Sequence, residues 1–236
     1  MAVFLLIESA TPICSVALVK DTGPLALRES TEENIHSSLI TVFVQEVFEE
    51  AGMAMGQIDA VAVSKGPGSY TGLRIGVSAA KGLCYALDKP LIAVPTLLSM
   101  ANGARAMLPE DETNRESTLL CPMIDAKRME VYTAVYDKGL KEIMDTTAMV
   151  IDEGSFSHLL NDHRVCFFGN GAGKCQEVLA GHENAIFLND FNLSSSFMSS
   201  LAEDAFRQKR FEDVAYFEPF YLKDFIAGKP KVKGLN

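Results

Sequence analysis

The order of predicted secondary structure repeats within the chain, and this repeat limits the fold more than any other feature. Residues 1–106 read as three β-type segments, a helix, a strand and a helix, and then a last strand and helix. After the polar segment MLPEDETNRES, the same βββαβα order returns in residues 107–236, although the two halves share few residues. The repeat predicts an α/β protein with two lobes of one architecture, 1–106 and 107–236, facing each other across a cleft. The prediction also allows the last segment of the chain to pack on the first lobe, although it follows the second lobe in the sequence.

Apolar periodicity gives approximate bounds for these elements. Strands are predicted at residues 3–8, 13–19, 25–30, 58–64, 91–94, 118–124, 130–136, 143–151, 165–168 and near 186. Helices are predicted at residues 34–52, 71–87, 96–107, 153–160, up to 179, and 196–208. The segment between 107 and 117 is predicted to be a linker, because it is polar and has no apolar period.

The composition favours a large buried core without a membrane segment. Of the 236 residues, 48% are hydrophobic, and no uninterrupted apolar run reaches the roughly 18 residues of a membrane-spanning helix. The opening MAVFLLIESATP has no basic start and reaches an acidic residue at Glu8. We therefore expect a buried first strand there rather than a signal peptide.

Cysteine usage and charge exclude two further classes. The five cysteines are odd in number and widely spaced, without a CxxC pair, which favours buried thiols in a reducing compartment over disulfides or zinc. The net charge of −10 should repel phosphate backbones unless basic residues gather on one face. Binding of nucleic acid by this chain alone is therefore not expected.

The glycine-rich stretch GPGSYTGLRIG, at residues 66–76, lies between a predicted strand and a long helix. A dinucleotide loop would need a third glycine where Thr71 stands, and the spacing of a Walker A loop is absent. A second turn, GNGAGK, comes closer, but Cys175 replaces the magnesium-binding hydroxyl. A tight turn with Ser69 or Thr71 as helix cap is the favoured interpretation, and phosphate binding stays as the lesser alternative.

The helix after this loop carries small residues at every fourth position: Gly72, Gly76 and Ala80. An internal glycine costs about 1 kcal/mol of helix stability relative to alanine, so packing should offset it. A stripe without side chains allows another backbone to approach closely. The spacing alone leaves open whether that backbone belongs to the same lobe or to another chain.

Candidate catalytic groups are few. His158 and His163 are five residues apart, which does not place them on one helix face, and no HExxH or GxSxG motif occurs. Glu8 and Asp125 end corresponding strands of the two halves. Two carboxylates facing a cleft could hold magnesium and a nucleotide, but Glu8 could equally cap its own turn.

Several segments together resemble one family. They are LLIESATPICSVAL, HSSLI, GPGSYTGLRIGVSAAKGL, MIDAKRMEVYTAVY and EPFYLKDF, and they cover most of the chain. These segments are similar to the TsaB family, also called YeaZ. The resemblance implies a two-lobed fold like that of actin, Hsp70 and sugar kinases (the ASKHA fold).

The resemblance also implies a function. TsaB proteins are bacterial cytoplasmic proteins needed to place threonylcarbamoyl on the adenosine next to the tRNA anticodon. They form homodimers when alone, pair with the catalytic paralogue TsaD, are joined by the ATPase TsaE, and meet tRNA only within that complex. Where TsaD has two metal-binding histidines, this chain has Thr96 and Met100 in VPTLLSM. Neither side chain can replace imidazole as a ligand, so we expect no metal, no cofactor and no catalysis here.

The family's partner surface implies candidate interface residues. They lie on the helix after GPGSYTG and on the helix that begins near HSS: Gly72, Leu73, Gly76, Val77, Ala80, Leu83, His36 and Leu39. The rival hypothesis is an active magnesium-nucleotide enzyme, with Glu8, Ser9, Thr11 and Asp125 around the cleft.

The tail YLKDFIAGKPKVKGLN is basic. It is interpreted as a solvated terminus, with contact to tRNA phosphates or to an acidic partner as the alternative.

Overall fold

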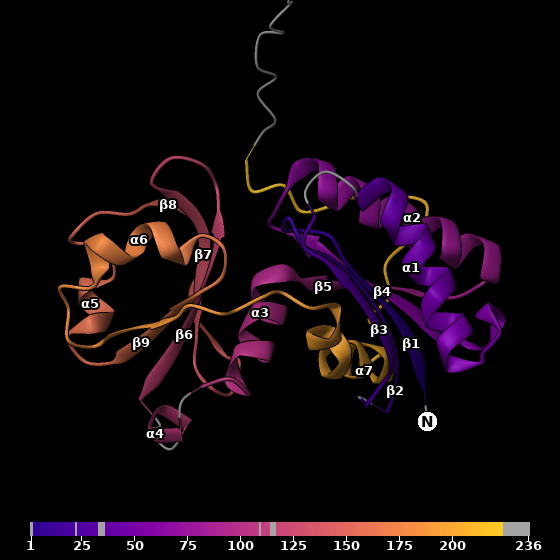
Figure 1. Ribbon diagram of the computed structural model, residues 1–236, viewed down its shortest axis with the longest axis horizontal. Coiled ribbons are helices and arrows are strands. Elements are labelled where there is room, and N and C mark those ends of the chain that lie inside the picture. Colours follow the sequence, from indigo (N-terminus) through magenta and orange to yellow (C-terminus); the bar gives the residue numbers. More distant parts are fainter. Residues whose placement is uncertain (1, 22, 33–35, 109, 114–116, 224–236) are drawn as a thin grey trace, which may run out of the picture.

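The computed structural model describes residues 2–21, 23–32, 36–108, 110–113 and 117–223. Its strands form two five-stranded sheets, one in each half of the sequence (Figure 1). The strands of the first sheet are β1 (Val3–Glu8), β2 (Cys14–Lys20), β3 (Gly23–Ser30), β4 (Ala60–Gly66) and β5 (Leu91–Pro95). Those of the second sheet are β6 (Thr118–Asp125), β7 (Glu130–Tyr136), β8 (Glu142–Val150), β9 (Arg164–Phe168) and β10 (Ala185–Leu188).

Both sheets have the same topology. The first has the order β3-β2-β1-β4-β5 and the second, reversed, β8-β7-β6-β9-β10. In each, the first three strands are antiparallel neighbours, and the fourth and fifth continue parallel to the first. The duplicated order predicted from the sequence is therefore confirmed, whereas the boundary between 106 and 107 stays a prediction.

Helices cover both faces of each sheet. The α-helices are α1 (His36–Ala51), α2 (Tyr70–Leu87), α3 (Thr96–Arg105), α4 (Glu110–Thr113), α5 (Ser157–Leu160), α6 (Ala172–Leu179) and α7 (Ser199–Arg207), with short 3-10 turns η1 (Met55–Gln57) and η2 (Ser195–Met198). On the outer faces, α1 and α2 pack on the first sheet and α5 and α6 on the second. On the inner faces, α7 packs on the first sheet and α3 on the second (Figure 1).

The first strand explains this layering. Leu5 and Ile7 point to the core beneath α1 and α2, while Phe4 and Leu6 point to the core beneath α7. All four are fully buried, as expected for a strand with helices on both faces. A continuous apolar run, rather than an alternating one, is the sequence pattern that this arrangement needs.

The structure differs from the element predictions in two places. The predicted linker contains α4, where buried Glu112 accepts a hydrogen bond from Thr118 (2.8 Å) and pairs with Arg164 (2.7 Å). The helix predicted from residue 153 begins only at Ser157. The Asp152 carboxylate accepts hydrogen bonds from the Gly154 amide (3.0 Å) and the Ser155 hydroxyl (2.9 Å), which favours a turn over a helix.

Residues 211–223, which we call the C-terminal strap, return to the first lobe. The strap begins beside β5, where Glu212 bridges to Leu91. Lys81 of α2 donates to the carbonyls of Ala215 (3.2 Å) and Phe217 (2.9 Å). None of the helices within the described ranges is long and apolar enough to cross a membrane.

Candidate functional sites between the lobes and on the paired helices

The turn after β1 is closed on itself. Glu8 is fully buried, and its Oε1 accepts hydrogen bonds from the Ala10 amide and the Ser64 hydroxyl, both at 2.7 Å. Its Oε2 is buried without a hydrogen-bond partner in the part of the chain that the structure describes. Burial raises the pKa of Glu8 to about 7, against the lowering effect of these hydrogen bonds. Glu8 therefore caps its own turn and offers no exposed oxygen to a cation.

The same turn is bonded to the start of α2. The Ser9 hydroxyl donates to the Gly72 carbonyl (2.9 Å), and the Ser69 amide donates to the Ala10 carbonyl (2.7 Å). Ser9 is fully buried, so the prediction that its hydroxyl faces the cleft is wrong. Thr11 is also largely buried, but it reaches the wall of a small cavity between the lobes.

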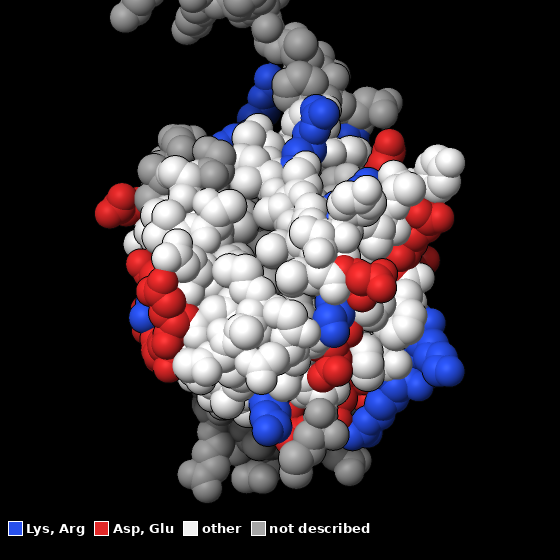
Figure 2. All heavy atoms as spheres, turned by 90° about the vertical axis from the view of Figure 1, so that its right-hand side faces the viewer, with Lys and Arg blue, Asp and Glu red and all other residues white. Residues whose placement is uncertain are grey.

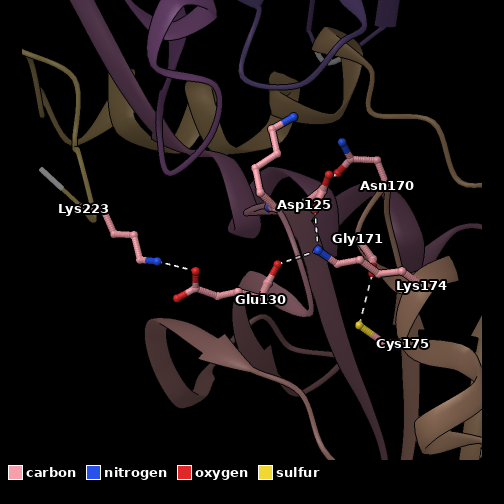
Figure 3. A network of polar contacts seen from close by, with 8 residues as sticks. Asp125, Glu130, Asn170, Gly171, Lys174, Cys175 and Lys223 are labelled. Carbon is pink, nitrogen blue, oxygen red and sulfur yellow. Dashed lines mark hydrogen bonds and ion pairs between the residues drawn. The ribbon is translucent and has the colours of Figure 1, made fainter. Parts of the chain in front are cut away.

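Asp125, the second predicted carboxylate, is paired with a lysine that compensates its negative charge. Lys174 of α6 contacts its Oδ1 and also donates to the Glu130 carbonyl at 2.7 Å (Figure 3). The Lys127 amide donates to the same Asp125 oxygen at 2.9 Å. Partial burial raises the pKa of Asp125, but the bonds from Lys174 and Lys127 outweigh it and the pKa is lowered overall. Asp125 is therefore an ionised partner of a lysine ammonium.

The interlobe cavity has a volume of about 190 Å³, and none of the described residues in its wall carries a charge. Its lining residues are Thr11, Pro12, Ile13, Thr31, Met100, Gly169, Asn170, Phe191, Asn192 and Leu193. Neither Glu8 nor Asp125 contributes to the lining. Across the described ranges, no three His, Cys, Asp or Glu side chains converge as possible metal ligands. The predicted pair of free carboxylates around magnesium is therefore wrong for this structure.

Thr96 and Met100 take structural roles on α3. The Thr96 hydroxyl accepts a hydrogen bond from the Gly66 amide (3.1 Å), and Thr96 is fully buried. Met100 is buried in the core between α3 and the second sheet. The positions at which the resemblance places the paralogue's histidines thus hold packing residues.

The small-residue stripe of α2 faces its own lobe. A Cβ built on Gly72 would lie 2.1 Å from the Ser9 carbonyl oxygen, and one on Gly76 would lie 2.1 Å from the Ser9 hydroxyl. Ala80 of the same helix is fully buried in the core of the first lobe. The backbone that approaches the stripe is therefore the β1–β2 turn. The prediction that Gly72, Gly76 and Ala80 form the partner surface is wrong.

The remaining predicted interface residues divide into buried and half-buried ones. Leu73 and Val77 are buried on the same inward side of α2. Leu83 and Leu39 are half-buried and pack against the core below the two helices. The His36 side chain lies outside the described part of the chain. Small residues at four-residue spacing indicate that this helix face is packed, but they do not indicate whether a segment of the same chain or a second chain packs against it.

A different face of the same two helices is open. Its exposed residues are Thr41, Val42 and Gln45 of α1 with Ser78, Gly82 and Tyr85 of α2, which we call the outer helix face. Tyr85 is 87% exposed and Val42 45%. A Cβ on Gly82 would meet no atom within 4 Å. Figure 2 shows the side of the molecule that carries α1 and α2, with a broad uncharged area from its centre to the left and charged residues on both sides of that area.

Sequence reasoning missed both the outer helix face and the lysine at Asp125. The outer face shows only as uncharged positions among charged ones on a helix surface, which is a weak signal. Lys174 is 49 residues from Asp125 in the sequence, so only the fold brings them together.

Comparisons with known proteins find relatives in the family that the sequence segments resemble. The family described as "TsaD: tRNA N6-adenosine threonylcarbamoyltransferase" matches residues 30–227. The tRNA threonylcarbamoyladenosine biosynthesis protein TsaB of Escherichia coli is 30% identical over 95% of this chain and 96% of its own. A tRNA N6-adenosine threonylcarbamoyltransferase of Symbiobacterium thermophilum is 35% identical over 50% of this chain and 37% of its own.

A solved structure supports the fold. YeaZ from Pseudomonas aeruginosa superimposes with a TM-score of 0.79 at 24% identity, covering 94% of this chain and 100% of that one. The two-lobed α/β architecture expected from the resemblance is confirmed. With the extent of the match to the Escherichia coli protein, these findings establish that the chain belongs to the TsaB (YeaZ) family.

Proposed function

We propose that the chain is a non-catalytic scaffold subunit for the formation of threonylcarbamoyladenosine next to the tRNA anticodon, in the cytoplasm. It acts by binding a TsaD-like catalytic paralogue, with a TsaE-like ATPase joining the assembly, and it forms a homodimer when alone. Relatives named for tRNA threonylcarbamoyladenosine biosynthesis, matched over nearly the whole chain, support the pathway.

The observation that carries the non-catalytic role is the occupation of the reactive positions by internal contacts. Glu8 is sealed beneath its turn and Asp125 is paired with Lys174. Thr96 and Met100 fill the core where the resemblance places metal histidines in the paralogue. Glu8 has no exposed oxygen and Asp125 is already paired with a lysine, so neither can bind a metal or activate a substrate without rearrangement.

The outer helix face is the surface proposed to bind the paralogue. It replaces the buried stripe, but it lies on the same two helices that the resemblance implicates. An exposed tyrosine among small, uncharged side chains resembles the centre of many protein interfaces, where aromatic anchors dominate binding and charged residues are depleted. Gly82 allows the facing chain to approach the helix closely. One face can serve the homodimer and the heterodimer in turn, so the two assemblies should compete.

Reconstitution tests the scaffold against the enzyme hypothesis. The purified chain is combined with the catalytic paralogue, the ATPase, ATP and tRNA, and modified adenosine is quantified by mass spectrometry. Because the proposal needs no chemistry from Glu8 or Asp125, we expect Glu8→Gln and Asp125→Asn to support modification within about twofold of the native chain. A loss of two orders of magnitude in either variant, with paralogue binding intact, would favour the nucleotide-dependent enzyme. Thermal stabilisation of the native chain by magnesium-ATP, abolished by Asp125→Asn, would point the same way.

A further inference from the structure

The turn between β6 and β7 is a tight hairpin that holds two cationic residues in an unusual backbone conformation. The Ala126 amide donates to the Glu130 carbonyl (3.0 Å), and the Glu130 amide donates to the Lys127 carbonyl (3.1 Å). Lys127 and Arg128 have φ values of 73° and 51°. A left-handed conformation costs a residue with a side chain about 1–2 kcal/mol, and such strain concentrates at functional sites. The hairpin thus defines the backbone conformation of Lys127 and Arg128 at the tip of the turn.

Each of the two carboxylates beside this turn has a lysine from another element as its ion-pair partner. Asp125 is paired with Lys174, and Glu130 is paired with Lys223 of the C-terminal strap (Figure 3). Lys127 and Arg128 are exposed, and neither forms an ion pair with any residue in the described ranges. A locally positive surface therefore exists on a chain whose net charge is −10.

Aromatic rings lie on the strap next to this positive surface. The rings of Tyr221 and Tyr70 are 4.9 Å apart between centroids, and the Arg74 guanidinium lies 5.3 Å from the centre of the Tyr70 ring. Phe220 is 45% exposed. Lys223 follows two residues after Tyr221 and pairs with Glu130, so this ion pair connects the strap that carries the rings to the end of the hairpin. Burial raises the pKa of Tyr221, and the negative charge of Glu218 adds to this effect, so Glu218 works against an anionic ligand at the rings.

We propose that this aromatic-cationic surface binds RNA in a single-stranded loop. Lys127, Arg128 and Arg74 would contact phosphates, and Phe220 and Tyr221 would stack on unpaired bases. Binding of single-stranded nucleic acid combines these two elements, a cationic track and rings on which bases stack. An acidic protein would need the cations but not the exposed rings, so the observations favour RNA. The inference rests on the proposed function, because it assigns to this subunit a contact with the tRNA of the complex.

Fluorescence anisotropy with a labelled RNA anticodon stem-loop tests the surface on the full-length chain at low salt. Lys127→Gln/Arg128→Gln should weaken binding about tenfold and reduce the slope of log affinity against log salt by about 1.5, since two phosphate contacts are lost. The control Lys20→Gln/Lys141→Gln removes the same charge from exposed positions at the far ends of β2 and of the β7–β8 hairpin. It should bind like the native chain.

Tyr221→Leu separates stacking from charge. It should weaken binding of the stem-loop about fivefold or more without affecting binding of a base-paired RNA duplex, which has no free bases. The proposal is overturned if the native chain does not bind the stem-loop, or if the two double variants bind equally. Displacement of the RNA by an acidic peptide together with no effect of Tyr221→Leu would indicate a protein partner instead. Co-purification of each variant with the catalytic paralogue is measured in parallel, so that failure of this surface and failure of the scaffold role are distinguished.

Discussion

Alanine substitutions at two glycines of α2 should have opposite effects on the stability of the monomer. At Gly72, the added Cβ would lie 2.1 Å from the Ser9 carbonyl oxygen, a backbone atom that cannot rotate away. At Gly82, the added Cβ would meet no atom within 4 Å. Both substitutions gain the same helix propensity, up to about 1 kcal/mol. Any difference between them therefore reports the packing of the inner stripe against the β1–β2 turn.

The magnitudes follow from these contacts. Overpacking against a fixed backbone costs about 1–3 kcal/mol, and loss of the hydrogen bond from Ser9 to Gly72 costs about 1 kcal/mol more. Gly72→Ala should therefore destabilise the chain by about 1–3 kcal/mol net, and lower Tm by about 2–12 °C for a protein of this size. Gly82→Ala should raise Tm by about 2–4 °C. Gly76→Ala should fall between them, because the atom it meets is the Ser9 hydroxyl, which can rotate at the expense of its hydrogen bond.

Urea titration followed by circular dichroism, at concentrations where the chain is monomeric, measures these differences. Sedimentation velocity on the same variants shows whether association changes. The reasoning is refuted if Gly72→Ala is as stable as Gly82→Ala but no longer associates. That result would place the stripe in an interface between chains.

Three further outcomes are expected. The pKa of Glu8 is raised to about 7 from 4.5, so the stability that its protonated carboxyl contributes is fully present below pH 4.5 and is lost as pH rises through 7. Relative to Glu8→Gln, the free energy of unfolding of the native chain should therefore fall by about 3 kcal/mol between pH 4.5 and 8. A difference between the two proteins that stays constant with pH would contradict the buried carboxyl. Lys174→Met should lower the free energy of unfolding by at most about 1 kcal/mol at neutral pH, because the ion pair with Asp125 is partly exposed. Since the pKa of Asp125 is lowered, this loss of stability should vanish as pH falls well below the usual value of 3.8. A loss that persists in acid would contradict the ion-pair explanation. Tyr85→Ala should weaken paralogue binding by about 2 kcal/mol in calorimetry, whereas an equal effect of Val42→Ala and Tyr85→Ala would argue against a central aromatic anchor.

The order of elements could be predicted from the sequence because each strand and helix has its own local pattern. The run in β1 is apolar at every position, as a strand buried on both faces requires, and its bounds were predicted correctly. The glycine-rich loop was predicted as a turn with Ser69 or Thr71 as the helix cap, and Ser69 is the cap, because its hydroxyl accepts a hydrogen bond from the Gly72 amide (3.2 Å). Local chemistry decided these features, so local sequence was sufficient.

The candidate site depended on contacts between distant segments, and there the predictions were weaker. Small residues at four-residue spacing have the same pattern whether they meet a turn of the same lobe or a second chain, and only the fold shows Ser9 against Gly72 and Gly76. Lys174 could not be assigned to Asp125 before the second sheet was known. A strand-end carboxylate also has the same sequence whether it faces a cleft or, as Glu8 does, turns back onto its own backbone.

Capture of the catalytic paralogue by the Gly82→Arg variant tests the central claim most directly. The guanidinium would project from an open position of the outer helix face, so the monomer should be at least as stable as the native one while homodimer and paralogue complex are both lost. The matched control is Lys20→Arg, which places an arginine on an exposed strand end away from α1 and α2. Undiminished recovery of the paralogue with Gly82→Arg, at native stability, would show that the chain does not use this face to bind its partner.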